Sequence, residues 1–215
     1  MATYLQLVND VLARLRENSV ASVSSTPYSI LIGKFVNDAK RQVEDAWNWD
    51  CLNATLTVTT SAGVSNYAVT GSGFRQKNVN VNDTTNKTEI TPAPIKWIVD
   101  QQQLTTVTNA PPVNYAWNGS DGTDSKVELF PTPNGTYTIK FNMTIPQIAL
   151  SADADILTVP SEPVIMGAYA RAIVERGEDG GMASSEAYAL FKGILSDLIA
   201  IESTRFIEND VFNPV

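Results

Sequence analysis

Residues 35–50, FVNDAKRQVEDAWNWD, and the segment LNATLTVTT that follows at 52–60 contain the change of pattern that decides the fold. In the first stretch an apolar residue recurs every four positions, the spacing of one face of an α-helix, at Phe35, Ala39, Val43 and Trp47. The charged side chains fall on its other faces, at Lys40, Arg41, Glu44 and Asp45. From Ala54, apolar residues instead alternate with threonine, which is typical of a half-buried strand. The chain is therefore expected to leave a helix after Trp49 and to enter a sheet.

Two helices are predicted in the N-terminal part of the chain. Residues 3–17 carry one apolar face, and Thr3 with Gln6 has the spacing of a capping box. The apolar positions of this face are Leu5, Val8, Leu12 and Leu15. The second helix is expected to have Thr26 as its N-cap and Pro27 as its first residue, and to continue to about Asn48. Its apolar stripe should pack against the first helix.

Two more helices are predicted near the C-terminus. Ser161 is a suitable cap for a helix from about Glu162 to Arg176, which GEDGG at 177–181 should stop. The last helix is expected over about 183–206. It has the clearest apolar stripe of the chain, at Ala187, Leu190, Phe191, Ile194, Leu195, Leu198 and Ile201.

The intervening region, 53–150, has the pattern of a mostly antiparallel β unit. Short strand-like segments alternate with turns rich in Asn, Gly, Asp and Pro. After the first strand at Ala54, these segments are VSNYAV (64–69), KNVNVND (77–83), TEITPAPIKWIV (88–99), KVELFP (126–131) and YTIKFNMTIP (137–146).

The order of helices and strands predicts an α+β fold. No pair of the helices can bury its apolar stripe alone, so the first two helices should pack with the last two. Residues 1–52 and 151–206 should form a four-helix bundle from two N-terminal and two C-terminal helices. Residues 53–150 should form a β insertion. Residues 207–215 have no helical or strand period and are expected to be an extended C-terminal tail.

Composition argues against most enzyme chemistry. The chain has no histidine, which excludes a Ser-His-Asp triad, a Cys-His dyad, an HExxH zinc site and an imidazole base. Cys51 is the only cysteine, so a thiolate metal cage within the chain is excluded, and it is predicted to be a small buried hydrophobe rather than a reactive thiol. GEDGGM lacks the spacing of a nucleotide-binding loop. No catalytic, cofactor or metal site is expected.

The net charge of −8 is unevenly distributed. Residues 53–150 carry six basic and six acidic side chains, whereas residues 151–215 carry four basic and eleven acidic ones. This balance of charge disfavours binding to nucleic-acid phosphates. It is compatible with an acidic channel surface that DNA passes without binding.

Three features remain open to a binding or catalytic interpretation. Asp153 and Asp155 could form half of a carboxylate pair or a weak cation site, although a solvated acidic connection before a helix is favoured. Trp97 and Trp117 could form a sugar-binding platform with Tyr67, Tyr115 and Tyr137, although packing is favoured. The terminal segment has five large apolar residues, Phe206, Ile207, Val211, Phe212 and Val215, and either folds back on its own bundle or docks on another chain.

The order of these segments resembles the head-to-tail adaptor of tailed bacteriophages, and most closely the tail tubular protein A and neck adaptor proteins of short-tailed phages. The similarity covers nearly the whole chain, through TYLQLVNDVLARL, FVNDAKRQVEDAWNWD, LFPTPNGTYTIKF, LTVPSEPVIMGAYARAIVERGED and AYALFKGIL. It is a similarity of pattern and order, and no single motif is diagnostic.

The resemblance implies a structural ring protein, a dodecamer between the portal protein and the tail nozzle protein that extends the DNA channel. A C-terminal segment would dock on the portal, which assigns this role to Phe206, Ile207, Val211, Phe212, Pro214 and Val215. The protein would be assembled in the host cytoplasm and located in the neck or tail of the virion, with no membrane partner. The alternative functions are a β-domain module that recognises a glycan or host surface, and a hydrolase that uses Asp153 and Asp155.

Overall fold

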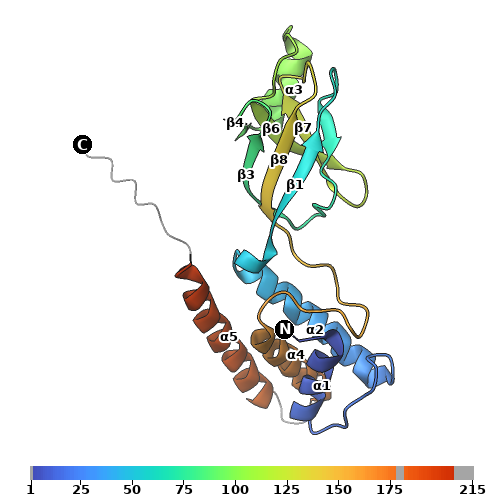
Figure 1. Cartoon of the computed structure of the whole chain (residues 1–215). Helices are drawn as coiled ribbons and strands as arrows, with labels where there is room; N and C mark the ends of the chain where they lie inside the picture. Colours follow the sequence, from blue (N-terminus) through green and yellow to red (C-terminus); the bar gives the residue numbers. More distant parts are fainter. Residues whose placement is uncertain (1, 178–181, 206–215) are drawn as a thin grey trace, which may run out of the picture. The chain divides into compact units, whose positions relative to one another are not determined.

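The computed structural model describes residues 2–177 and 182–205, and it has the predicted α+β architecture (Figure 1). The chain divides into two compact units. The helical unit consists of Met1–Leu52 and Gln147–Val215, and the β unit consists of Asn53–Pro146. No helix among the described residues is long and apolar enough to span a lipid bilayer.

The N-terminal helices begin as predicted. Helix α1 (Tyr4–Arg14) starts at a capping box in which the Thr3 hydroxyl accepts from the Gln6 amide and the Gln6 side chain accepts from the Thr3 amide. Helix α2 (Pro27–Ala46) has Thr26 as its N-cap, and the Thr26 hydroxyl accepts from the Ser29 amide at 3.0 Å. It ends two residues before the expected Asn48 and is followed by the short 3₁₀-helix η1 (Asp50–Leu52).

The C-terminal helices differ from prediction at their ends. Helix α4 (Ser161–Arg176) follows Pro160, so Ser161 is its first residue and not its cap. Gly177 terminates it with a left-handed φ of 64°, which glycine adopts without strain. Helix α5 (Met182–Ser203) ends before Phe206. Residues 207–215, predicted as an extended tail, and residue 206, predicted as the end of the last helix, lie outside the described residues.

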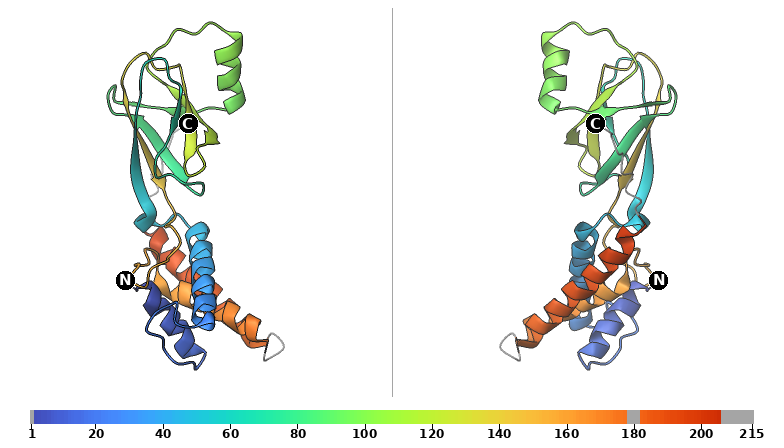
Figure 2. Two further views of the ribbon diagram at one scale, coloured as in Figure 1. Left: turned by 90° about the vertical axis from the view of Figure 1, so that its right-hand side faces the viewer. Right: turned by 90° about the vertical axis from the view of Figure 1, so that its left-hand side faces the viewer.

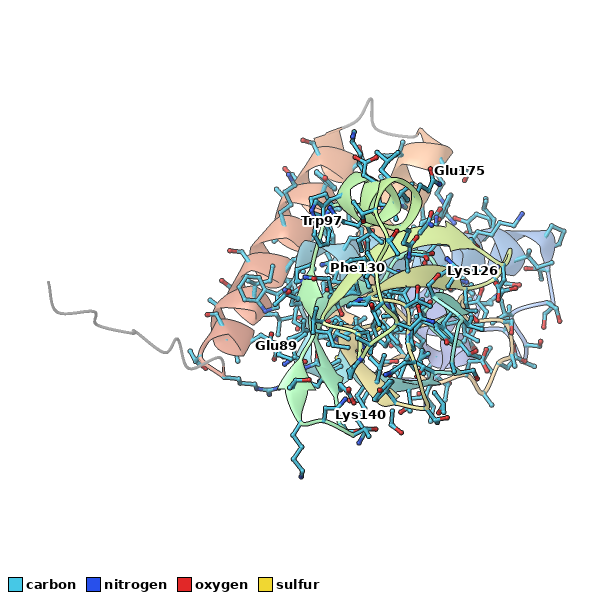
Figure 3. All side chains as sticks on the ribbon, turned by 90° about the horizontal axis from the view of Figure 1, so that it is seen from above. Glu89, Trp97, Lys126, Phe130, Lys140 and Glu175 are labelled. Atoms are coloured by element: carbon cyan, nitrogen blue, oxygen red, sulfur yellow. The ribbon has the colours of Figure 1, made fainter. Side chains whose placement is uncertain are left out.

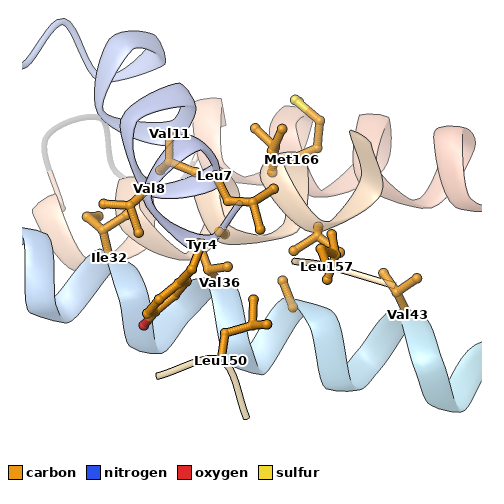
Figure 4. Packing of buried hydrophobic residues seen from close by; sticks show 14 of the residues in the cluster. Tyr4, Leu7, Val8, Val11, Ile32, Val36, Val43, Leu150, Leu157 and Met166 are labelled. Atoms are coloured by element: carbon orange, nitrogen blue, oxygen red, sulfur yellow. The ribbon is translucent and has the colours of Figure 1, made fainter. Parts of the chain in front are cut away.

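Helices α1, α2, α4 and α5 enclose one hydrophobic core (Figure 4). Leu7, Val8 and Val11 of α1 and Ile32 and Val36 of α2 belong to this core, and all five side chains are fully buried. Glycines permit the close helix contacts. A Cβ on Gly33 would overlap the Tyr4 hydroxyl, and one on Gly167 would lie 3.1 Å from the Ala39 Cβ.

Lys40 and Glu44 lie outside the apolar stripe of α2, as predicted, but they are buried. Their side chains are 3% and 0% exposed, and Lys40 Nζ lies 3.0 Å from Glu44 Oε1. Lys40 Nζ also donates to the carbonyl oxygens of Gln147 at 2.7 Å and Ile148 at 3.0 Å, and Glu44 Oε1 accepts from the Gln147 amide. The segment that returns from the β unit covers this face of α2, and the ion pair satisfies its backbone groups. Phe35 and Trp47, predicted in the core stripe, are only partly buried.

The β unit contains two four-stranded sheets, which are mostly antiparallel as predicted. The first has the order β1 (Asn53–Thr59), β8 (Thr138–Thr144), β3 (Lys77–Asp83) and β4 (Thr88–Glu89). The second has the order β2 (Asn66–Ala68), β7 (Ser125–Phe130), β6 (Asn114–Ser120) and β5 (Thr91–Pro92), and its β5–β6 pair is parallel. Both sheets contribute to one core, in which Leu56 and Val58 of β1 face Phe141 and Ile139 of β8.

Two elements of the β unit were not predicted. The interpretation of 88–99 as strand-like is wrong for its second half, where helix α3 (Ile95–Leu104) begins after Pro94 (Figure 2). The residues that favour this helix, IKWIVDQQQL, extend beyond the segment that had been read as a strand. Strand β6 includes Asn118, Gly119 and Ser120, residue types that favour turns. Pairing with β7 holds them in the sheet, with a shift of register between Trp117 and Ser120.

Candidate functional site

A pocket of about 350 Å³ lies within the helical unit at the C-terminal end of α5. Its walls come from four segments: Ala2 before α1, the turn after α2, the segment that leads into α4, and the last turns of α5 with Arg205. The lining residues that matter below are Trp49, Cys51, Leu157, Leu198, Ile201 and Glu202. Trp49 and Leu157 are 1% and 2% exposed and belong to the hydrophobic core, whereas Ile201 is 59% exposed. The pocket is therefore an opening from the solvent onto the core of the helical unit.

Glu202 provides the polar part of this pocket. Its Oε1 accepts a hydrogen bond from the Asp50 amide at 2.9 Å, and its Oε2 lies 3.0 Å from Arg205 Nη1. Glu202 is only 7% exposed although it belongs to the last turn of α5. The carboxylate thus joins the end of α5 to the start of η1, and it fixes the geometry of the pocket.

The prediction that Cys51 is buried is wrong, because the residue is exposed and lines the pocket. Partial burial of the sulfur raises the pKa of the Cys51 thiol, and the negative charges of Glu202 and Asp50 raise it further. A raised pKa reduces the thiolate fraction, so the environment does not activate Cys51 as a nucleophile.

The predicted docking residues Phe206, Ile207, Val211, Phe212, Pro214 and Val215 all lie outside the described residues. The last described residue is Arg205, which lines the pocket. The segment that carries the predicted docking residues therefore starts at the rim of the pocket.

Asp153 and Asp155 act as hydrogen-bond acceptors for the backbone of the helical unit. Asp153 Oδ1 accepts from the Val23 amide at 2.9 Å. Asp155 Oδ2 accepts from the amides of Ser151 and Ala152, and these bonds lower the pKa of Asp155. Within the described ranges no cluster of three or more His, Cys, Asp or Glu side chains is arranged to hold a metal ion. The geometry favours the structural interpretation of both carboxylates.

The aromatic side chains of the β unit pack in two different clusters. Trp117 is partly buried against Phe141, with ring centroids 5.9 Å apart, and Tyr115 is buried beside it. Trp97 lies on α3 and makes an edge contact with Phe130 at 5.1 Å (Figure 3). Packing is thus observed for Trp117 and Tyr115. Trp97 differs, because 40% of it is exposed.

Glu128 forms a buried polar cluster that the sequence reasoning missed. It lies on β7 and is 6% exposed. Its carboxylate accepts from Asn66 at 2.8 Å, Gln102 at 3.0 Å and Asn118 at 3.3 Å, which belong to β2, α3 and β6. Burial acts to raise the pKa of Glu128, but hydrogen bonds from these amides and from Ser65 outweigh it and hold the pKa below its ordinary value. The carboxylate thereby attaches α3 to the sheet.

Replacing Glu128 with glutamine is expected to lower the unfolding free energy of the β unit by about 1.5–3 kcal/mol at neutral pH, because the amide donors lose a charged acceptor. The lowered pKa in the folded state means that this stabilisation is complete above the pKa of the unfolded state, near 4.3, and is lost as the pH falls through the folded-state pKa. Thermal unfolding from pH 7 to pH 3 should therefore show wild type and Glu128→Gln converging in acid. Glu89→Gln, at an exposed site on β4, is the control. An equal difference at all pH values would contradict this account.

The C-terminal helices expose large apolar side chains. Val174 of α4 is 66% exposed, and Tyr188, Leu190 and Ile201 of α5 are 41%, 59% and 59% exposed. Helix α5 packs mainly on α4, so much of its surface has no neighbour among the described residues of the helical unit. Exposed apolar side chains of this size gather at surfaces where proteins associate.

A comparison with protein families identifies the chain. The family model described as SU10 adaptor protein matches residues 2–210, which is nearly the whole chain and reaches beyond Arg205. No curated protein matches the sequence. The match agrees with the resemblance found from the order of the segments and with the α+β fold. The chain therefore belongs to the SU10 adaptor protein family, a structural family of phage head-to-tail adaptors and not a family of enzymes.

Proposed function

We propose that the protein assembles into a closed ring, a dodecamer, that joins the portal protein to the tail nozzle protein and extends the DNA channel in the neck of the virion. The observation that carries this proposal is the exposed apolar surface of α4 and α5 in a member of an adaptor family. In a ring each subunit presents one surface to the preceding copy and a different one to the next. Val174, Tyr188, Leu190 and Ile201 would be covered by such a contact.

The charge of the helical unit suits a channel wall. The β unit carries six basic and six acidic side chains, so the whole net charge of −8 belongs to the helical unit. A ring of such units repels the phosphates of DNA and lets the duplex pass without specific binding. In this proposal DNA is a passenger and not a ligand.

The portal is the proposed partner of the C-terminal tail. Phe206, Ile207, Val211, Phe212, Pro214 and Val215 form a short apolar segment at the end of an acidic unit, and such a segment can dock on a partner as an extended peptide. Deleting residues 207–215 is expected to leave a folded protein that no longer binds the portal. Co-purification with the portal protein of the same genome measures binding, and circular dichroism measures folding. Retained portal binding would contradict tail docking.

The proposed function is tested by electron microscopy of this protein mixed with the portal protein from its own genome. The expected result is an additional layer of density that has the symmetry of the portal. The protein alone can remain monomeric under this proposal, because assembly on the portal would be sufficient. Failure to bind under conditions in which the portal ring is intact would contradict the adaptor function.

A second candidate function is recognition of a glycan or host surface by the β unit. The observation that favours it is the exposure of Trp97, Ile95 and Leu104 on α3, at 40%, 36% and 78%. In the glycan-recognition hypothesis, Trp97→Ala abolishes binding on a glycan array without loss of fold. Trp117→Ala is expected to behave differently and to destabilise the unit, because that partly buried ring packs against the core. Absence of glycan binding by the wild-type protein would remove this candidate, and unchanged binding by Trp97→Ala would remove the assigned role of Trp97.

A further inference from the structure

The pocket at the end of α5 and the end of the described chain are at the same place. Arg205 lines the pocket and is followed directly by FIENDVFNPV, residues 206–215. Half of these ten residues are large and apolar: Phe206, Ile207, Val211, Phe212 and Val215. A solvated terminal segment gains nothing from such side chains, since each of them stabilises a protein only when it is removed from water.

The pocket has the shape and chemistry to receive apolar side chains. Its volume of about 350 Å³ is at the lower end of the range of pockets that hold small ligands. Leu157, Leu198 and Ile201 give it apolar walls, and the side chain of Trp49 is held in place by a hydrogen bond from Nε1 to the Val43 carbonyl at 2.7 Å. The carboxylate of Glu202 is already engaged by Arg205 and the Asp50 amide. An apolar side chain could therefore enter the pocket without breaking a hydrogen bond of Glu202.

We propose that in the unassembled protein residues 206–215 fold back into this pocket and place apolar side chains against Leu157, Leu198 and Ile201. Ten residues reach at most about 33–36 Å when fully extended, so the tail can reach every part of a pocket at whose rim it begins. A short tether also gives the tail an effective concentration in the millimolar range, which favours the chain's own tail over that of another copy.

This inference goes beyond the proposed function, because the seating of the tail does not depend on any partner. If the same tail docks on the portal, it cannot occupy both sites at once. Release from the pocket then becomes a step of assembly, and the free subunit keeps its apolar segment covered until the portal competes for it. The acidic residues Glu208 and Asp210 are expected to remain at the solvent side, since the pocket already contains the charge of Glu202.

Cys51 is a natural probe for this seating, because it is the only cysteine, lies in the pocket and is exposed. The rate of its alkylation is compared, at one pH, between the full chain and a chain that ends at Arg205. A tail that is seated about 90% of the time should slow alkylation about tenfold in the full chain relative to the shortened one. A synthetic peptide of residues 206–215 should restore part of the protection to the shortened chain.

Two matched substitutions on α5 test whether protection of Cys51 depends on a residue of the pocket. Ile201 and Leu190 are both 59% exposed, but only Ile201 lines the pocket. In the full chain, Ile201→Asn is expected to raise the alkylation rate toward that of the shortened chain, and Leu190→Asn to leave it unchanged. In the shortened chain neither substitution should change the rate, which controls for a direct effect on the thiol.

The outcomes decide between three states of the tail. Protection that is equal at about 1 and 100 μM protein supports seating of the chain's own tail, whereas protection that grows with concentration assigns the pocket to the tail of a second copy and overturns the proposal. Equal alkylation rates in the full and shortened chains, with unchanged NMR signals for residues 157–161 and 198–205, would also overturn it. Electron microscopy with the portal is a separate test, so loss of portal binding with Cys51 still protected would contradict only the adaptor function.

Discussion

Replacing Glu44 with leucine is expected to lower the free energy of unfolding of the helical unit by about 3–5 kcal/mol, because it leaves the ammonium of Lys40 buried without its carboxylate partner. The Lys40 side chain is 3% exposed, so it cannot reach solvent without disturbing the core. The substitution also removes the acceptor of the Gln147 amide. Urea unfolding followed by far-ultraviolet circular dichroism, which reports mainly on the helices, measures the loss.

The double variant Lys40→Met, Glu44→Leu is the informative control. A buried ion pair that is replaced by apolar residues of similar size often costs little, because the desolvation of both charges is removed together. The double variant is therefore expected to be more stable than Glu44→Leu alone, although it loses the hydrogen bonds from Lys40 to the carbonyl groups of Gln147 and Ile148. A loss of unfolding free energy below about 1 kcal/mol for Glu44→Leu would show that water reaches the ion pair in solution.

Phe191→Ala is expected to cost about 3–5 kcal/mol, the range found when a phenylalanine is removed from a packed core. Among the described residues of α5, Phe191 is the large apolar side chain that is completely buried. Its ring lies against Gly167 of α4, where a Cβ would come within 3.2 Å of it, so the close packing of α4 and α5 depends on this pair. Loss of the ring should loosen α5 and, with it, the pocket and the exposed apolar surface. Chemical unfolding, with assembly on the portal as a second readout, measures both effects.

Leu190→Ala is the matched control for that substitution. Leu190 is the preceding residue and is 59% exposed, so its loss should change the unfolding free energy by less than about 0.5 kcal/mol. If the exposed surface of α5 makes contacts within a ring, Leu190→Ala will nevertheless weaken assembly on the portal. A large loss of stability in Leu190→Ala, or none in Phe191→Ala, would contradict the packing of α5 described above.

The fold class and the identity of most elements were predictable from the amino-acid sequence. The periodicities of 3.6 and 2 separate helices from strands, and they are local properties that survive in a single sequence. The helix starts at Thr3 and Thr26 were predictable for the same reason, because their signals are local: Thr3 and Gln6 have the spacing of a capping box, and Pro27 follows Thr26 directly. The order of these segments was also sufficient for the resemblance to phage adaptors, which the family match confirms.

Which polar side chains are buried was not predictable from the sequence, because it depends on contacts between distant segments. Lys40 and Glu44 lie outside the apolar stripe of α2, and they are buried because residues 147–148, about a hundred positions away, cover them. Glu128 is buried because α3 covers its side of β7, and the sequence pattern predicted a strand for the first half of α3. Strand β6 depends on pairing with β7 across residues that favour turns. Periodicity shows which face of an element is apolar, but whether a distant segment covers a polar face is a property of the folded chain. The exposure of Cys51 was not predictable for the same reason, because it depends on how the end of α5 packs beside it.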